Sequence, residues 1–155
     1  MTNFYDGWLQ LADNWNEQSA QAKKHIHEEE LQWVRTKQDH RAALLCSREN
    51  GFLTSGDIVL GEIPPGCNTG KHYHGEEAIY ITQGKGCSVI DGIRYEWEKD
   101  SCLFIPFGVV HQHFNTGTVV DRFIRGNYTL RSKMFQPIAK KVFPYLYYEF
   151  GDEPE

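Results

Sequence analysis

From about residue 40 onward, short runs rich in β-branched and aromatic residues alternate with clusters of Gly, Pro, Asn and Asp. Such runs, bounded by turn residues, are typical of β-strands. The expected strands are Ala42–Cys46, Ile58–Ile63, Ala78–Thr82, Cys87–Ile90, Ile93–Trp97, Cys102–Ile105, Val110–Phe114 and Val119–Arg125. The dipeptide Asp91-Gly92 lies between two of these runs and predicts a two-residue β-hairpin. Because no helical pattern separates the runs, we expect an all-β sandwich or barrel.

The first forty residues follow a different pattern, in which Gly is rare and Gln, Glu, Lys and Ala are common. Apolar side chains recur there at helical spacing: Trp8, Leu11, Ala12 and Trp15, and later Leu31 and Val34. This spacing predicts one or two helices with an apolar packing face. We therefore expect a helical extension over residues 1–39 and a β-domain over residues 40–150. An aromatic run at residues 142–150 is expected to pack on the β-domain or on a second subunit.

The size and charge of the chain narrow the possible partners. Its 155 residues fit one domain, and its formal net charge of -5 gives no electrostatic footprint for nucleic acid or an anionic membrane. No apolar run approaches the roughly 20 residues of a membrane-spanning helix. Residues 1–15 lack the basic stretch of a signal peptide, so we expect a cytoplasmic location. The four cysteines form no C-x-x-C pair, which gives no indication of a zinc ribbon or a redox dithiol.

Candidate metal ligands begin with His72 and His74. On an extended strand, side chains at positions i and i+2 share one face, so both imidazoles can reach one ion. Glu77 opens the next expected strand, and if it faces inward, Ile79 and Ile81 share its face. This would place a carboxylate above an apolar floor.

A further ligand is expected on the segment from Pro106 to Asn115, where His111 and His113 share one face of a strand. Three imidazoles and one carboxylate suit one divalent transition metal: Fe, Mn, Ni, Co or Zn. In an octahedral shell they leave two open positions. His25 and His27 repeat the H-x-H spacing, but they lie in a helical pattern where such side chains point apart, so we expect no metal there.

These two segments resemble the motifs of the cupin superfamily. The first motif, G-x5-H-x-H-x3–4-E-x6-G, is matched by Gly66, His72, His74, Glu77 and Gly84, with one residue fewer between His74 and Glu77. Glu76 competes for the glutamate position, but only Glu77 keeps the interval to Gly84. The second motif, G-x5-P-x-G-x2-H-x3-N, is matched by Pro106, Gly108, His111 and Asn115, with Asp100 in place of its first glycine.

The resemblance covers roughly residues 40–130. It implies a double-stranded β-helix, the cupin jelly-roll barrel, with metal ligands at His72, His74, Glu77 and His111. Single-domain cupins often form dimers, so a homodimer is expected. Cupins include enzymes and non-enzymatic proteins, so the fold alone does not give the function.

We expect a metal-dependent enzyme with a small-molecule substrate, and first an oxygenase acting on a small organic acid or phenol. The segment from His111 to Asn115 resembles the H-x-H-x-N segment of gentisate-type dioxygenases. Those enzymes bind iron through three histidines alone, so oxygenases that keep the glutamate fit better. An oxygen-independent isomerase, epimerase or lyase is the alternative, and it needs a general base, for which His113, Tyr80 and Glu96 are candidates. A non-enzymatic ligand-binding protein is the third hypothesis.

Overall fold

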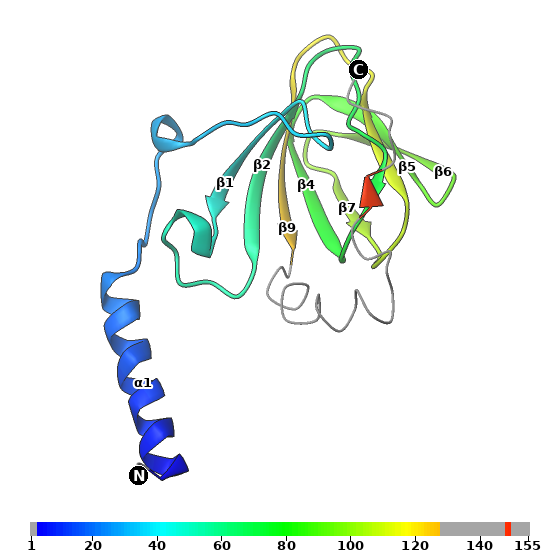
Figure 1. The fold of residues 1–155 in the computed structure, drawn as a ribbon. Helices are drawn as coiled ribbons and strands as arrows, with labels where there is room; N and C mark the ends of the chain where they lie inside the picture. The colour runs from blue at the N-terminus through cyan, green and yellow to red at the C-terminus, as the bar shows by residue number, and fades with distance from the viewer. Residues whose placement is uncertain (1–2, 128–147, 150–155) are drawn as a thin grey trace.

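The computed structural model of the protein describes residues 3–127 and 148–149 (Figure 1). Its strands are β1 (Arg41–Cys46), β2 (Asp57–Ile63), β3 (His72–Tyr73), β4 (Glu77–Gln83), β5 (Lys85–Ile90), β6 (Ile93–Glu98), β7 (Cys102–Ile105), β8 (His111–Asn115), β9 (Asp121–Asn127) and β10 (Tyr148–Glu149). Its helical segments are α1 (Phe4–Gln21), η1 (Glu28–Glu30) and η2 (Arg48–Asn50). Every strand expected from the sequence is therefore confirmed.

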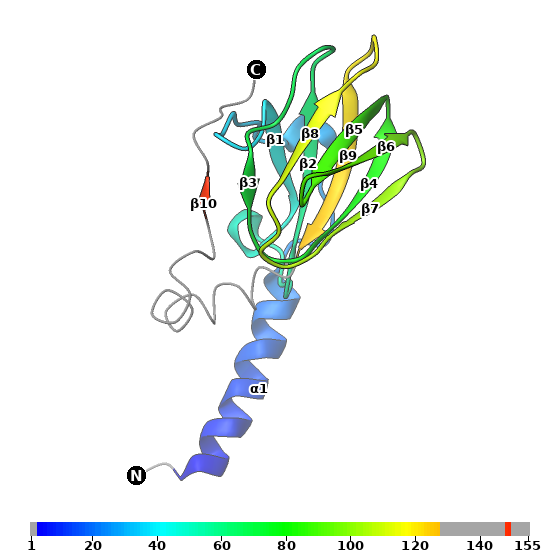
Figure 2. The ribbon, with the colours of Figure 1, turned by 90° about the vertical axis from the view of Figure 1, so that its right-hand side faces the viewer.

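The strands form two antiparallel sheets that face each other (Figure 2). One sheet has the order β1-β2-β9-β4-β7, and the other has the order β10-β3-β8-β5-β6. The expected jelly-roll β-barrel is confirmed. The hairpin between β5 and β6 is also confirmed, since Asp91 and Gly92 both have positive φ, 52° and 77°, as a type I′ turn requires.

The core lies between the two sheets and follows the two-residue period of the strands. On β4, Glu77, Ile79 and Ile81 are buried, whereas Ala78 and Tyr80 are exposed. The apolar residues that fill this space are Ile63, Ile79, Ile81, Ile90, Trp97, Ile105 and Phe123. The expected apolar floor beneath Glu77 is therefore present.

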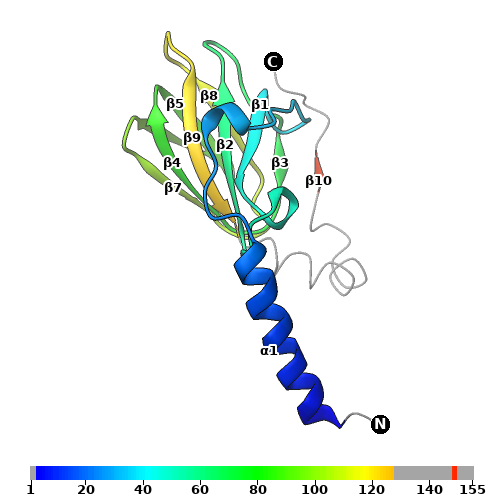
Figure 3. The same ribbon diagram turned by 90° about the vertical axis from the view of Figure 1, so that its left-hand side faces the viewer.

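The N-terminal helix α1 is present, but it extends away from the barrel in all three views (Figure 3). Asn3 caps it, because the Asn3 side chain accepts hydrogen bonds from the backbone N–H groups of Tyr5 and Asp6. Phe4, Leu9 and Trp15 are exposed. For Trp15, the expectation of a packed apolar face is wrong, and the side chains of Trp8, Leu11 and Ala12 lie outside the described part of the structure.

The expectation of a possible second helix is also wrong, because between residues 22 and 40 only Glu28–Glu30 is helical. The backbone of Val34 instead pairs with Ala42 at the edge of β1. Leu31 is buried in a second apolar cluster with Ala43 and Leu60, and this packing favours extended chain over helix. Pairing and burial thus override the local helical pattern.

Three expectations concern the rest of the chain. Of the aromatic run at residues 142–150, only Tyr148 and Glu149 are among the described residues, and their backbone pairs with Tyr73 and His72 of β3. The division of the chain at residues 39 and 40 and the homodimer stay predictions. No helix among residues 3–127 and 148–149 has the length and hydropathy needed to cross a membrane.

Candidate metal centre

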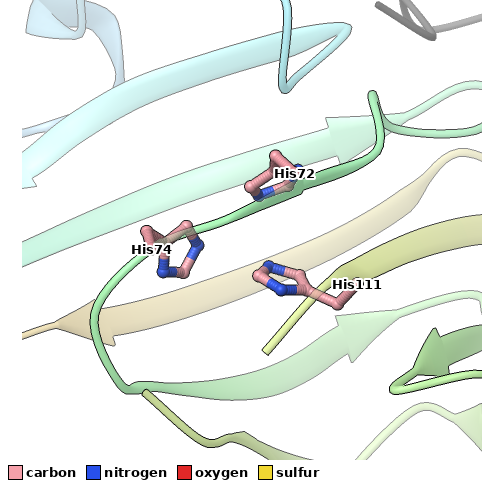
Figure 4. Close-up of side chains that lie close together, drawn as sticks. All are labelled: His72, His74 and His111. Atoms are coloured by element: carbon pink, nitrogen blue, oxygen red, sulfur yellow. The ribbon is translucent and has the colours of Figure 1, made fainter. Parts of the chain in front are cut away.

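Three histidines from two strand segments point toward one another inside the barrel (Figure 4). His72 on β3 lies opposite His111 on β8, and His74 follows directly after β3. The ring centroids are 4.3 Å apart for His72 and His111, 4.7 Å for His74 and His111, and 5.1 Å for His72 and His74. One nitrogen of each ring lies within 4.8 Å of the others, so the cluster could hold a metal ion.

Hydrogen bonds to the backbone determine which ring nitrogen is available in each histidine. The Nδ1 atoms of His72, His74 and His111 lie 2.7, 2.6 and 2.8 Å from the carbonyl oxygens of Gly70, Gly75 and Val109. A carbonyl oxygen can only accept, so each Nδ1 carries the proton and each Nε2 carries a lone pair. This is the tautomer that a metal-binding histidine needs when its other nitrogen is oriented by a carbonyl.

Burial keeps these imidazoles neutral. Desolvation, together with the neighbouring histidines, lowers the pKa of His72 to about 2 and the pKa of His111 to about 4. The pKa of His74 is also lowered, mainly by burial. Neutral imidazole is the form that binds a cation, so the cluster is ready to bind at physiological pH.

Glu77 adjoins this cluster at the start of β4, with its side chain 2% exposed. Its Oε2 atom lies 3.7 Å from Nε2 of His74. Both atoms are acceptors, so their approach is unfavourable unless a cation lies between them. Among the described residues, Glu77 Oε2, His72 Nε2 and His111 Nε2 are buried without a hydrogen-bond partner. Buried acceptors of this kind fit a missing divalent cation.

Two further buried charges lie next to Glu77. Arg125 on β9 donates to both carboxylate oxygens of Asp39, and its Nε atom lies 3.6 Å from Glu77 Oε1. Burial raises the pKa of Glu77, and the Arg125 charge opposes that shift. Arg125 thus helps to hold Glu77 ionised, as a metal-binding carboxylate must be.

His113 is buried beside the cluster but differs from it in its hydrogen bonds. Its Nδ1 atom lies 2.6 Å from Ser88 Oγ, and the indole N–H of Trp97 donates to the same oxygen at 2.8 Å. Trp97 occupies one lone pair of the Ser88 oxygen, and among the described residues His113 Nδ1 is the acceptor within reach of the Ser88 hydroxyl proton, so we assign Ser88 as the donor to Nδ1. In the neutral ring the proton therefore sits on Nε2, so His113 offers a hydrogen-bond donor where the other three offer lone pairs.

The structure does not bring Tyr80 and Glu96 to this site. Tyr80 lies on the outer face of β4, where its hydroxyl donates to Asp100 at 3.0 Å. Glu96 on β6 is 66% exposed and pairs with Arg94. The prediction that either residue could act as a general base here is wrong, because strand alternation turns both side chains to solvent.

His25 and His27 lie outside the barrel, in an extended segment rather than the expected helix, with ring centroids 5.4 Å apart. Asn115 holds the following loop: its amide donates to the carbonyl oxygens of Ile63 and Val119, and its oxygen accepts from Gly117.

Sequence reasoning missed Asp39, Arg125, Ser88 and Trp97. Arg125 could have been found from the sequence, because it shares a strand face with Asp121 and Phe123 at two-residue spacing. A charged side chain on an inward face is rare without a partner, so this position predicts a buried ion pair. Arg125 also borders a cavity of about 900 Å³, whose walls include Val34, Leu44 and Val59. This volume is in the range of small-molecule sites.

Comparisons with known proteins agree with this geometry. Residues 59–124 match a family model described as Cupin domain. The chain is 36% identical over 59 residues to "Uncharacterized protein MJ1618" of Methanocaldococcus jannaschii, and 32% identical over 73 residues to "Polyketide synthase CurC" of Streptomyces cyaneus. These matches cover 37% and 46% of this chain and 47% of each relative. The chain therefore matches about half the length of these curated relatives.

Solved structures show the same fold. The polyketide cyclase RemF from Streptomyces resistomycificus has a TM-score of 0.58 and 21% identity, over 67% of this chain and 78% of that one. A predicted oxalate decarboxylase from Thermotoga maritima has a TM-score of 0.57 and 21% identity, over 66% of this chain and 96% of that one. At this level of identity, the likeness concerns the fold alone.

Proposed function

Because the chain belongs to the cupin superfamily, we propose that it is a metal-dependent enzyme whose first candidate activity is oxygenation of a small organic acid or phenol. The observation that carries this proposal is the set of three inward-facing Nε2 lone pairs on His72, His74 and His111. With Glu77 as a fourth ligand, an octahedral ion keeps two positions for substrate or dioxygen.

A divalent ion in this site would polarise substrate oxygens as a Lewis acid and, if it were iron or manganese, could also support oxygen chemistry. The protein supplies the rest of the environment. The apolar residues beneath Glu77 limit water around the site.

His113 is the residue that we assign to stabilising negative charge on the substrate. Ser88 and Trp97 fix its ring so that Nε2 presents a proton to the barrel interior. Burial lowers the pKa of His113 well below its usual value, so the ring is a neutral donor and a weak base. A neutral histidine can stabilise negative charge that develops on a substrate oxygen.

Oxygen uptake tests the proposed oxygenase. The protein is loaded with Fe(II) under anaerobic conditions and mixed with catechol-like, 2-hydroxyphenolic and 2-hydroxy acid substrates, and dioxygen is then added. We expect uptake with at least one class, and loss of uptake in His72→Ala. Absence of uptake with every class would refute the oxygenase.

An oxygen-independent reaction is the second candidate, and two observations favour it. His113 is placed as a hydrogen-bond donor, and the chain resembles proteins named as a polyketide synthase and a polyketide cyclase. A panel of β-dicarbonyl compounds in D2O, with the Zn(II) or Mn(II) protein under argon, tests this candidate by NMR. Faster exchange of the acidic C–H in the parent than in His113→Gln supports it, and equal rates contradict it.

A further inference from the structure

A turn in the N-terminal segment, Thr36–Asp39, reaches the metal cluster by two separate routes. The first route runs through side chains. Asp39, which is 2% exposed, accepts from Arg125 at 3.0 Å, and Arg125 Nε lies 3.6 Å from Glu77 Oε1. Because Arg125 occupies the Oε1 side of the carboxylate, Oε2 is left facing His74.

The second route runs through the backbone. The carbonyl oxygen of Gln38 accepts from the N–H of Gly70 at 2.9 Å. The carbonyl oxygen of Gly70 in turn accepts from Nδ1 of His72 at 2.7 Å. Gln38 therefore anchors the backbone of Gly70 at its N–H, and the carbonyl group of the same residue sets the ring orientation and the tautomer of His72.

The turn is itself held closed. Thr36 Oγ1 accepts from the backbone N–H groups of Gln38 and Asp39, at 3.0 Å each. The backbone N–H of Thr36 donates to the carbonyl oxygen of Asp39 at 3.0 Å. These bonds fix the positions of Gln38 and Asp39 relative to each other, and so couple the two routes.

We propose that Thr36–Asp39 is a positioning turn for the metal centre, which orients His72 through Gln38 and Glu77 through Asp39 and Arg125. This proposal rests on the metal-dependent function proposed above. Asp39 and Arg125 lie outside residues 59–124, the segment that matches the cupin model. The partners that orient metal ligands contribute strongly to affinity, and their loss weakens metal binding about 10- to 100-fold.

Titration of the metal-free full-length chain with Co(II), followed by its visible absorption, tests the proposal. Asp39→Asn keeps the shape of the side chain but removes its charge, so Arg125 is free to turn toward Glu77 and compete with the ion. Thr36→Val keeps the shape of an exposed side chain but removes the acceptor that closes the turn. We expect each variant to weaken Co(II) binding about tenfold or more and to alter the absorption bands. Arg125→Lys, which retains the charge without the two-pronged contact, should do the same.

Two control variants distinguish orientation of the metal ligands from a general effect of loosening the contact between the N-terminal segment and the barrel. Arg122 lies on the same strand as Arg125 but on the outer face, where it pairs with Glu28 of that segment. Thr54 closes a comparable turn with Gly56, away from the cluster. Arg122→Gln and Thr54→Val should bind Co(II) within about twofold of the parent, since neither contacts a partner of a ligand.

The outcomes are distinct. Parent-like affinity and absorption in both Asp39→Asn and Thr36→Val would overturn the positioning turn and leave the metal-dependent function intact. An equal loss of affinity in Arg122→Gln would also overturn it, because the effect would then come from attachment alone. If the parent chain itself bound no Co(II), Mn(II) or Fe(II), the metal-dependent function would fail, and the positioning turn with it.

Discussion

His72 and His111 are direct cross-strand neighbours on β3 and β8, and their ring centroids are 4.3 Å apart. Antiparallel pairing puts the two side chains on the same face of the sheet. Each ring donates Nδ1–H to a carbonyl within its own strand segment, so the two Nε2 atoms meet as acceptors. A shared cation would stabilise such a pair of buried acceptors without donors, so this pair forms the base of the candidate metal centre.

Metal content after removal of His72 is the first prediction. Protein purified without chelator is expected to carry about one divalent ion per chain, because three buried neutral histidines should retain it. His72→Ala should lose most of that metal, because one ligand is removed and His111 loses its neighbour. Elemental analysis measures this. His25→Ala is the matched control, since His25 belongs to an H-x-H pair outside the barrel and its loss should leave metal content unchanged.

Replacement of Glu77 by Gln tests the carboxylate ligand. The amide keeps the size of the side chain but removes the charge that would face the ion, so the affinity for Mn(II) should fall about tenfold or more. Isothermal titration of the metal-free protein measures the affinity. Glu76→Gln is the control, because the neighbouring glutamate is less buried and lies outside the cluster. Equal affinities of the parent and Glu77→Gln would exclude the carboxylate as a ligand.

Removal of the Ser88 hydroxyl should affect both stability and the His113 tautomer. In Ser88→Ala, the buried indole N–H of Trp97 and Nδ1 of His113 lose their shared partner. The free energy of unfolding should fall by about 1–3 kcal/mol, the usual effect of leaving buried polar groups unpaired. Nitrogen NMR shifts should show His113 moving toward a mixture of tautomers. A serine in an exposed turn, Ser101, is the control, and Ser101→Ala should change neither property.

Asp121 should make the stability of the fold depend on pH. Burial raises the pKa of this carboxyl group from 3.8 to about 7, although its Oδ1 accepts from the backbone N–H of Lys85. Between about pH 4 and 7 the folded state therefore binds more protons than the unfolded state. The free energy of unfolding should fall as pH rises through this range and should not change further above it because of this group. Chemical denaturation at several pH values measures this slope. Asp121→Asn should remove it, and an unchanged slope in the variant would contradict the prediction.

The sequence predicted the strands and the clustering of His72, His74 and His111 because both depend on local patterns. Strand periodicity fixes which side chains share a face, so His72 and His74 could be paired with each other from spacing alone. The same rule excludes Tyr80 from the site. If Glu77 faces inward, Tyr80 lies three positions along the same strand and faces outward. Glu96 could not be assigned in this way, because the orientation of β6 depends on its register with β5.

The residues that orient the metal ligands, Asp39 and Arg125, could not be predicted from the sequence because their contact is long-range. Asp39 and Arg125 are 86 positions apart, and Asp39 lies in an irregular turn with no periodic pattern. The segment after α1 was misassigned for a related reason. Its composition favours helix, but the free edge of β1 offers backbone partners to Val34, and the cluster around Leu31 buries its apolar side chains.

The ligands of the proposed metal centre come from both layers of the barrel: His72 and His111 lie in one sheet, and Glu77 lies in the other. An ion shared among them would join the two layers directly, so its binding energy would add to the energy that holds the fold together. Survival of the protein in the cell would then depend on the supply of the ion, and chains made under metal starvation would be degraded first.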